Sequence, residues 1–199
     1  MIEQQAEEFW QWFVKNEALI QGCITNPESE SREYVIEHLN NYILAFGPLK
    51  WDLGLNDADE WFFVISPNCD EQLLEITSEL IELAPTFLNW QFHDSVPAKD
   101  WNRQFSVYDH EMEVLTVDAS AWHYIAFTAG EKVEVILEAP NLNFTNEETT
   151  AIIGNLFLLN EIGERLLIER IAKYSLVSEL DDEDQEYKYP IGDLREHVQ

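Results

Sequence analysis

A run of five apolar residues, Trp61 to Ile65, restricts the possible folds more than any other part of the sequence. The run does not alternate between apolar and polar residues, so it differs from a strand that has one face in water. It predicts a central strand that is covered on both faces. The turn-forming residues 56–59 separate it from a second apolar segment, 50–55, and the two segments together predict a β-hairpin.

Two helices are predicted before this hairpin. Residues 2–20 have apolar side chains at steps of four, three and four, which is the spacing of an amphipathic helix. A similar pattern follows Asn26 and Pro27, which predicts that Asn26 caps a second helix with proline in its first turn. Gly47 and the proline after it end this pattern.

A third helix is predicted between Asn68 and Pro85, with Asn68 and Glu71 in the positions of a capping box. One face of this helix is apolar. No Lys or Arg occurs between Asp70 and Ala84, so carboxylates four residues apart repel one another along the other face. That face carries Glu71, Glu75, Glu79 and Glu82.

The rest of the chain is predicted to be rich in strands, with one helix. A capping box of Thr145 and Glu148 opens that helix, which Gly163 ends. The pattern after Glu164 fits either more helix or a strand near 174–177, and six acids within residues 179–186 predict a loop. Strands are expected at 90–94, 113–118, 122–128 and 132–138, with a polar loop over 97–110.

This order of elements predicts an α+β fold with a mixed, mostly antiparallel sheet and helices packed on one face. Two N-terminal helices precede two β-β-α-(β) halves. The length of 199 residues fits one domain or two small, closely packed domains, and we predict one domain. Within it, residues 1–100 and 101–178 are possible sub-halves, and 179–199 form an acidic loop and tail.

The chain carries 39 acidic and 11 basic residues, a formal net charge of −28 at pH 7. Such a polyanion repels phosphate backbones and anionic lipid, which argues against nucleic-acid and membrane-surface binding. The content of 46% hydrophobic and 13% aromatic residues argues against disorder.

The sequence points to a soluble cytoplasmic protein. Its first ten residues contain three Glu and no Lys or Arg, unlike a signal or transit peptide. No apolar run approaches the roughly 18 to 20 residues that cross a bilayer. Only Cys23 and Cys69 are present, too few for a secreted disulfide scaffold.

Several common catalytic motifs are absent from the sequence. The seven glycines are too scattered for a phosphate-binding loop, and there is no G-x-S-x-G nucleophile elbow. His110 and Glu111 do not form a zincin motif, because Val114 stands where the second His would be. No cofactor is expected.

Cys69 is the best candidate nucleophile, since it lies just after the predicted central strand and at the first turn of a predicted helix, whose amides would lower the pKa of a thiol. The neighbouring Asp70 and Glu71 disfavour a thiolate. We therefore interpret Cys69 as a structural cysteine, of the kind that is usually buried.

One mixed group of side chains could bind a divalent metal or support a hydrolase. It consists of His93, Asp109, His110 and His123, with acids beside them. Their spacing matches no known metal site, and acids beside a His are expected by chance in so acidic a chain. No metal site is predicted, and a small hydrolase or metal-dependent enzyme built on these residues stays open as an alternative.

Seven tryptophans are many for this length, and tryptophan is frequent at the centre of interfaces. Most belong to helix or strand patterns and are expected in the core. Trp12 lies off the apolar stripe of its helix and Trp101 lies in a polar loop, so both are candidate exposed anchors. Aromatic rings rimmed by acids suit a cationic partner.

Four segments resemble those of a group of uncharacterised bacterial cytoplasmic proteins, and the likeness spans roughly residues 9–164. They are FWQWFVKNEALI, WFFVISPN, LAPTFLNWQFHDSVPAK and LNEIGE. The matching positions are aromatic and turn residues, so the resemblance implies a fold and no catalytic residues. By its charge alone the chain is also similar to immunity proteins that neutralise basic toxins.

Together these features favour a non-enzymatic, acidic binding protein that engages a basic protein partner in an immunity-like or inhibitor role. The predicted contact residues are Glu71, Glu75, Glu79, Glu82, Trp12 and Trp101. Besides the enzyme alternative, a domain that binds a small ligand between helices and sheet stays open.

Overall fold

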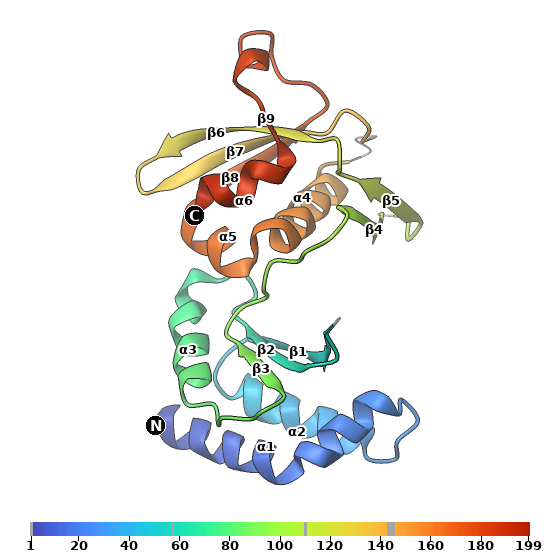
Figure 1. Ribbon diagram of the computed structural model, residues 1–199, viewed down its shortest axis with the longest axis vertical. Coiled ribbons are helices and arrows are strands. Elements are labelled where there is room, and N and C mark those ends of the chain that lie inside the picture. Colours follow the sequence, from blue (N-terminus) through green and yellow to red (C-terminus); the bar gives the residue numbers. More distant parts are fainter. Residues whose placement is uncertain (1, 57, 110, 143–145) are drawn as a thin grey trace. The chain divides into compact units, whose positions relative to one another are not determined.

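The computed structural model of the chain describes residues 2–56, 58–109, 111–142 and 146–199 (Figure 1). Contacts divide the chain into two compact units, Met1–Val96 and Pro97–Gln199, called here the N-terminal and C-terminal units. Both combine helices with strands, and four of the six strand pairs are antiparallel, which confirms the predicted α+β class. That the chain is a single domain stays a prediction.

The N-terminal unit is built on a three-stranded sheet in the order β1-β2-β3. The first two strands form the predicted antiparallel hairpin, and β3 joins β2 in parallel. The central position of the run at 61–65 is thereby confirmed. The elements of this unit are α1 (Ile2–Thr25), α2 (Arg32–Leu44), β1 (Lys50–Leu55), β2 (Trp61–Ser66), α3 (Glu71–Glu82) and β3 (Trp90–His93).

Aromatic side chains fill the core between this sheet and its helices. Phe9 and Phe13 of α1 are fully buried, and their ring centroids lie 6.1 Å and 5.4 Å from that of Phe63 on β2. Ile65 of β2 belongs to the same core. Val64 lies between Phe63 and Ile65 and points to the opposite face of β2, yet it is also buried. The strand is therefore covered on both faces, as its unbroken apolar run predicts.

The predicted cap of the second helix is wrong. The side chain of Asn26 accepts a hydrogen bond from the Glu28 amide, and the Asn26 amide donates to Gly22 O in the last turn of α1. Asn26 therefore closes the first helix and starts a turn. The second helix begins six positions later, at Arg32.

The predicted cap of the third helix is also wrong. Asp70, and not Asn68, is the N-cap of α3, and its carboxylate accepts a hydrogen bond from the Gln72 amide. Asn68 and Cys69 both have positive φ, 55° and 60°, and form the tight connection between β2 and the helix. Asparagine tolerates this conformation, which accounts for its place before the cap.

The C-terminal unit contains a two-stranded sheet, β4-β5, and a four-stranded sheet in the order β8-β7-β6-β9. In Figure 1, α4, α5 and α6 lie on one side of the four-stranded sheet, and the segment that carries η1 rises from the other. The strands are β4 (Gln104–Tyr108), β5 (Val114–Asp118), β6 (His123–Ala129), β7 (Lys132–Glu138), β8 (Ile171–Val177) and β9 (Tyr189–Pro190); the helices are α4 (Glu147–Ile162), α5 (Glu164–Arg170) and α6 (Leu194–Val198), with short 3-10 helices η1 (Gln185–Tyr187) and η2 (Ile191–Asp193).

The polar loop expected over residues 97–110 is partly wrong, because β4 lies within it and pairs with β5. The sequence pattern of this strand is weak because few of its side chains face the core. Val107 is buried and Phe105 is half-buried against the same core, while Gln104, Ser106 and Tyr108 are exposed.

Helix α4 packs closely on the four-stranded sheet. Its N-cap is Asn146, whose side chain accepts a hydrogen bond from the Thr149 amide. Thr145, which the sequence placed in this role, lies outside the described residues. Gly163, with φ 84°, separates α4 from α5 as expected. The ambiguity after residue 164 is resolved as a helix followed by a strand, and η1 interrupts the end of the loop expected over 179–186.

Within the part of the chain that the structure describes, no helix has both the length and the apolar character needed to cross a membrane.

Candidate functional site

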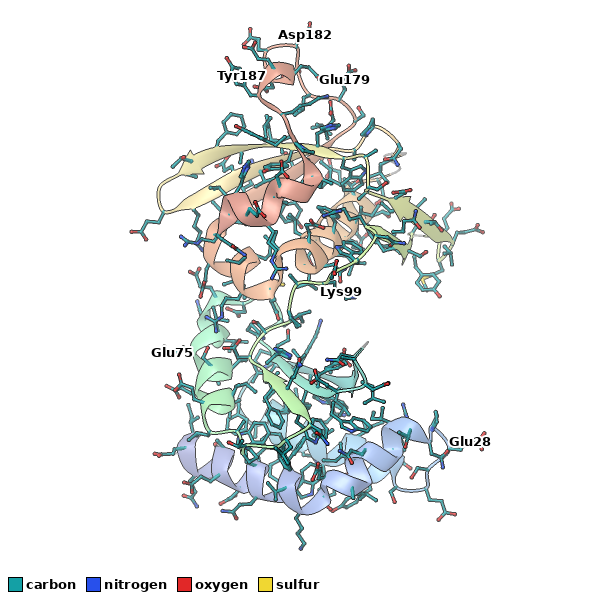
Figure 2. All side chains as sticks on the ribbon, in the orientation of Figure 1. Glu28, Glu75, Lys99, Glu179, Asp182 and Tyr187 are labelled. Atoms are coloured by element: carbon teal, nitrogen blue, oxygen red, sulfur yellow. The ribbon has the colours of Figure 1, made fainter. Side chains whose placement is uncertain are left out.

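The four glutamates predicted on one side of α3 are all exposed, and we call Glu71, Glu75, Glu79 and Glu82 the acidic face. The opposite side of the helix is buried through Leu74, Thr77 and Leu80. Figure 2 shows Glu75 projecting outward from α3. The sequence pattern therefore predicted correctly which side of this helix meets the solvent.

Hydrogen bonds fix α3 in the N-terminal unit. The Trp10 indole N–H of α1 donates to Leu80 O at 2.8 Å. The Ser78 hydroxyl lies 3.0 Å from Asp94 Oδ2, just beyond β3. Both contacts come from the second half of α3 and, with the buried residues Leu74, Thr77 and Leu80, they fix which side of the helix carries the acidic face.

Trp12 is half-buried instead of exposed. Its ring stacks on His38 of α2, with the centroids 5.6 Å apart and the planes 9° from parallel. A second contact joins it to Tyr42 at 5.5 Å. Its indole N–H is buried and has no hydrogen-bond partner among the described residues. Trp12 packs α1 against α2, so the expectation of an exposed anchor is wrong.

Trp101 is half-buried as well, and its exposure was also predicted wrongly. The indole N–H donates to Glu161 Oε2 at 3.0 Å, and the ring centroid lies 6.0 Å from that of Phe157. Arg103 holds the same carboxylate. These contacts attach the segment before β4 to α4, so Trp101 stabilises the fold of the C-terminal unit.

The candidate metal ligands are spread over different elements. His93 on β3 belongs to the N-terminal unit, and burial lowers its pKa while the charge of Asp94 opposes that shift. The Asp109 carboxylate accepts the amides of Glu111 and Glu113 in the turn of the β4-β5 hairpin. His110 lies outside the described residues. Among the residues that are described, no three His, Cys, Asp or Glu side chains are grouped as metal ligands.

His123 contributes to a polar cluster centred on Glu138, which the sequence did not reveal. The two residues are register partners on β6 and β7, and His123 Nδ1 lies 3.5 Å from Glu138 Oε2. The Glu138 side chain is only 6% exposed. Lys188 Nζ donates to Oε2 at 2.9 Å, and the Leu180 amide and Gln185 side chain donate to Oε1.

Burial by itself raises the pKa of Glu138. The hydrogen bonds from Lys188, the Leu180 amide and Gln185 outweigh burial, together with the positive charge of Lys188, so the pKa lies below the ordinary value. The carboxylate is therefore ionised at neutral pH.

These donors come from one acidic segment, residues 178–188, whose Glu179, Asp182 and Tyr187 are labelled in Figure 2. A cavity of about 540 Å³ lies between this segment and the sheet, lined by His123, Glu138 and Lys188 among others. Each group that contacts Glu138 is itself polar and needs a partner when it is removed from water. The cluster attaches the acidic segment to the outer side of β6 and β7.

A second polar contact joins β6 to the C-terminal helix α6. The Tyr124 hydroxyl is hydrogen-bonded to His197 Nδ1, and the His197 ring packs edge-on against Tyr189 of β9. Burial raises the pKa of Tyr124, and the charges of Asp193 and Tyr189 raise it further. Tyr124 is therefore a neutral hydrogen-bonding group of the core and no base at neutral pH.

The two cysteines have opposite surroundings. Cys23 is buried on α1, whereas Cys69 is exposed, so the expectation that Cys69 is a buried structural residue is wrong. Cys69 also stands before the cap of α3 and not in its first turn. Its thiol is accessible to solvent.

Comparison of the chain with protein-family models, curated proteins and solved structures finds no match. The arguments about function below therefore rest on the residues themselves.

Proposed function

We propose that the protein is an acidic, non-enzymatic binding protein that engages a basic protein partner through the acidic face of α3, in an inhibitor or immunity-like role. The observation that carries the proposal is the exposure of all four glutamates on a helix whose other side is anchored. We place the interaction in the reducing cytoplasm, where thiols such as those of Cys23 and Cys69, which form no disulfide, stay reduced.

Charge favours a basic partner in two ways. The net charge of −28 attracts cations over a distance and raises the rate of encounter, most strongly at low salt. The acidic face adds a local contact in which Lys or Arg side chains meet carboxylates at fixed spacing on a helix. Repulsion among these glutamates falls when the partner is bound, which adds to the gain.

The test compares two variants that lose the same number of charges. One replaces the acidic face: E71Q, E75Q, E79Q and E82Q. The control replaces four other exposed glutamates of the N-terminal unit: E28Q, E30Q, E33Q and E37Q. The full-length wild type and both variants are immobilised and exposed to native lysate at low and then moderate salt, and the retained proteins are identified.

We expect the wild type and the control to retain the same basic protein, and the acidic-face variant to lose it. Purified partner then gives the affinities directly. Equal retention by the two variants would mean that overall charge, and not the acidic face, is responsible. Retention of no basic protein by the wild type at low salt would overturn the proposed function.

A further inference from the structure

An apolar groove lies at the end of the acidic face, within the N-terminal unit. It has a volume of about 490 Å³ and is formed by α1 and by the residues that follow α3. Trp10, Val14, Leu83 and Pro85 supply apolar surface, and the polar residues Glu7, Gln11 and Lys15 complete the lining. The groove is open to solvent, since Val14 is 49% and Leu83 40% exposed.

The groove has a firm base. Trp10 is only 4% exposed, and its indole N–H is bonded to Leu80 O. Its ring also packs against Phe13 and Phe63 in the core. The groove is therefore preformed, and filling it requires little rearrangement of the protein.

Leu83 connects the groove to the acidic face. Residues four apart on a helix lie above one another, and Glu71, Glu75, Glu79 and Leu83 follow each other at that spacing. Leu83 is the C-cap of α3 and keeps helical dihedral angles, so this row continues to the helix end. A row of carboxylates thus ends at an exposed apolar residue.

We propose that the groove receives an apolar side chain from a basic helical segment of the partner, whose Lys or Arg residues lie along the acidic face. This inference rests on the proposed function and specifies the chemistry of the partner. The row from Glu71 to Leu83 spans about 18 Å, at 1.5 Å per residue, which corresponds to roughly three turns of a partner helix. The acids steer and orient this segment, and the apolar anchor prolongs the complex.

The acids of α3 next to the groove favour this occupant. Glu7 lies at the groove and Glu79 and Glu82 lie on the last turn of α3, while Lys15 is the one basic residue among those lining it in the described chain. Glu7 and Lys15 offset each other in the lining, so it is the acidic face, which ends at Leu83, that disfavours an acidic segment. A basic helix with one apolar end satisfies both the acids and the groove.

The test uses three synthetic helical peptides as probes for the full-length protein. The first has Lys at every fourth position and two Leu at the end of the same row. The second has the same composition with the two Leu on the opposite face. The third has Glu in place of each Lys. Affinity is measured by fluorescence anisotropy of labelled peptide at several salt concentrations.

Two double variants separate the groove from other apolar surface. V14Q with L83Q makes the groove polar without changing charge. I36Q with L44Q changes two α2 residues of similar exposure, 37% and 58%, and serves as the control. All four positions are exposed, so both variants should remain folded, which circular dichroism verifies.

We expect the first peptide to bind wild type and the α2 control alike, and the groove variant about tenfold or more weakly. The second peptide cannot place its Leu residues in the groove. It should therefore bind wild type, the groove variant and the α2 control equally, as weakly as the first peptide binds the groove variant. The Glu peptide should not bind. Equal affinity of the first peptide for the groove variant and wild type would overturn the groove proposal.

The outcomes also distinguish the groove from the acidic face. If E71Q, E75Q, E79Q and E82Q together abolish peptide binding while V14Q with L83Q does not weaken it, the proposed function survives and the groove proposal fails. If neither variant weakens it, both fail. Sedimentation shows whether a second copy of the chain occupies the groove, since a dimer that V14Q with L83Q dissociates would also overturn the proposal.

Discussion

Arg103 and Glu161 form a two-point ion pair across 58 residues of the chain: Arg103 Nε lies 3.0 Å from Glu161 Oε2, and Nη2 lies 2.8 Å from Oε1. The Glu161 side chain is 5% exposed. Arg103 directly precedes β4 and has the unfavourable positive φ of 61°. The ion pair attaches this residue, and with it the start of β4, to α4.

We predict that R103A lowers the free energy of unfolding by about 3 kcal/mol, because it leaves a buried carboxylate without its counter-charge. R165A removes the exposed pair between Arg165 and Glu169 and should cost no more than about 0.5 kcal/mol. Urea denaturation of both variants measures the difference. Equal losses would show that the Arg103 pair is not desolvated as described.

Glu138 makes the stability of the protein depend on pH in the acidic range. Its pKa is lowered on folding from an ordinary 4.5, so its stabilising effect is complete above pH 4.5 and disappears as the pH falls through the lower, folded-state pKa. At neutral pH we expect E138Q to cost about 2 kcal/mol, since a neutral amide holds Lys188 less well. Below pH 4.5 the difference from wild type should shrink.

The matched control for this prediction is E134Q, an exposed position on the same strand. Its effect should stay within about 0.5 kcal/mol at every pH. Urea denaturation over a pH series provides the measurement. A difference between wild type and E138Q that did not vary with pH would contradict the assigned role.

Gly154 and Gly22 should respond oppositely to alanine, although both lie within helices. A Cβ at Gly154 would lie 2.6 Å from Leu176 Cδ1 and 2.7 Å from Tyr174 Cε2, so G154A should lose about 1–3 kcal/mol by overpacking α4 on β8. A Cβ at Gly22 meets nothing within 4 Å, and G22A should gain up to about 1 kcal/mol from helix propensity. Thermal or urea denaturation of the two variants measures these changes in stability. A stabilised G154A would show that α4 can move away from the sheet.

Trp10 and Trp12 test the value of an indole hydrogen bond. W10F removes the donor to Leu80 O and should cost about 1–2 kcal/mol. W12F removes an indole N–H that has no partner among the described residues, so the cost should be no more than about 0.5 kcal/mol. A larger loss for W12F than for W10F in chemical denaturation would reverse this assignment.

The exposure of the two thiols predicts their reactivity. Cys69 is exposed and Cys23 is 2% exposed, so a maleimide should modify one thiol per native chain and two after denaturation. Mass spectrometry of the digested protein locates the label. C69S should abolish the fast reaction, and modification of Cys23 at the same rate would mean that α1 opens readily.

Elements with strong local patterns were predictable from the sequence. The hairpin of β1 and β2, the strand β7 and the two sides of α3 follow directly from the arrangement of apolar residues. Helix caps were less predictable, because Asn26 and Asn68 can bond in turns as well as in caps. Strand β8 was ambiguous, since only its pairing with β7 distinguishes it from a helix.

The polar clusters could not be predicted, since their members are distant in sequence. Glu138 is hydrogen-bonded to residues 42 and 50 positions away, so its partners cannot be found from the sequence around it. One signal was present: Glu138 directly follows the apolar residues 135–137 of a strand, where an exposed acid is unusual. The acidic face was predictable because it depends on one helix alone.

The spacing of glutamates on α3 also makes this helix a reporter of its ionic surroundings. Each pair of like charges four residues apart costs a helix roughly 0.2–0.5 kcal/mol, and salt screens this cost. Amide hydrogens of α3 should therefore exchange with deuterium faster at low salt than at high salt. A bound polycation should slow that exchange more than simple salt does, so the rate of exchange records occupancy of the acidic face even when the identity of the partner is unknown.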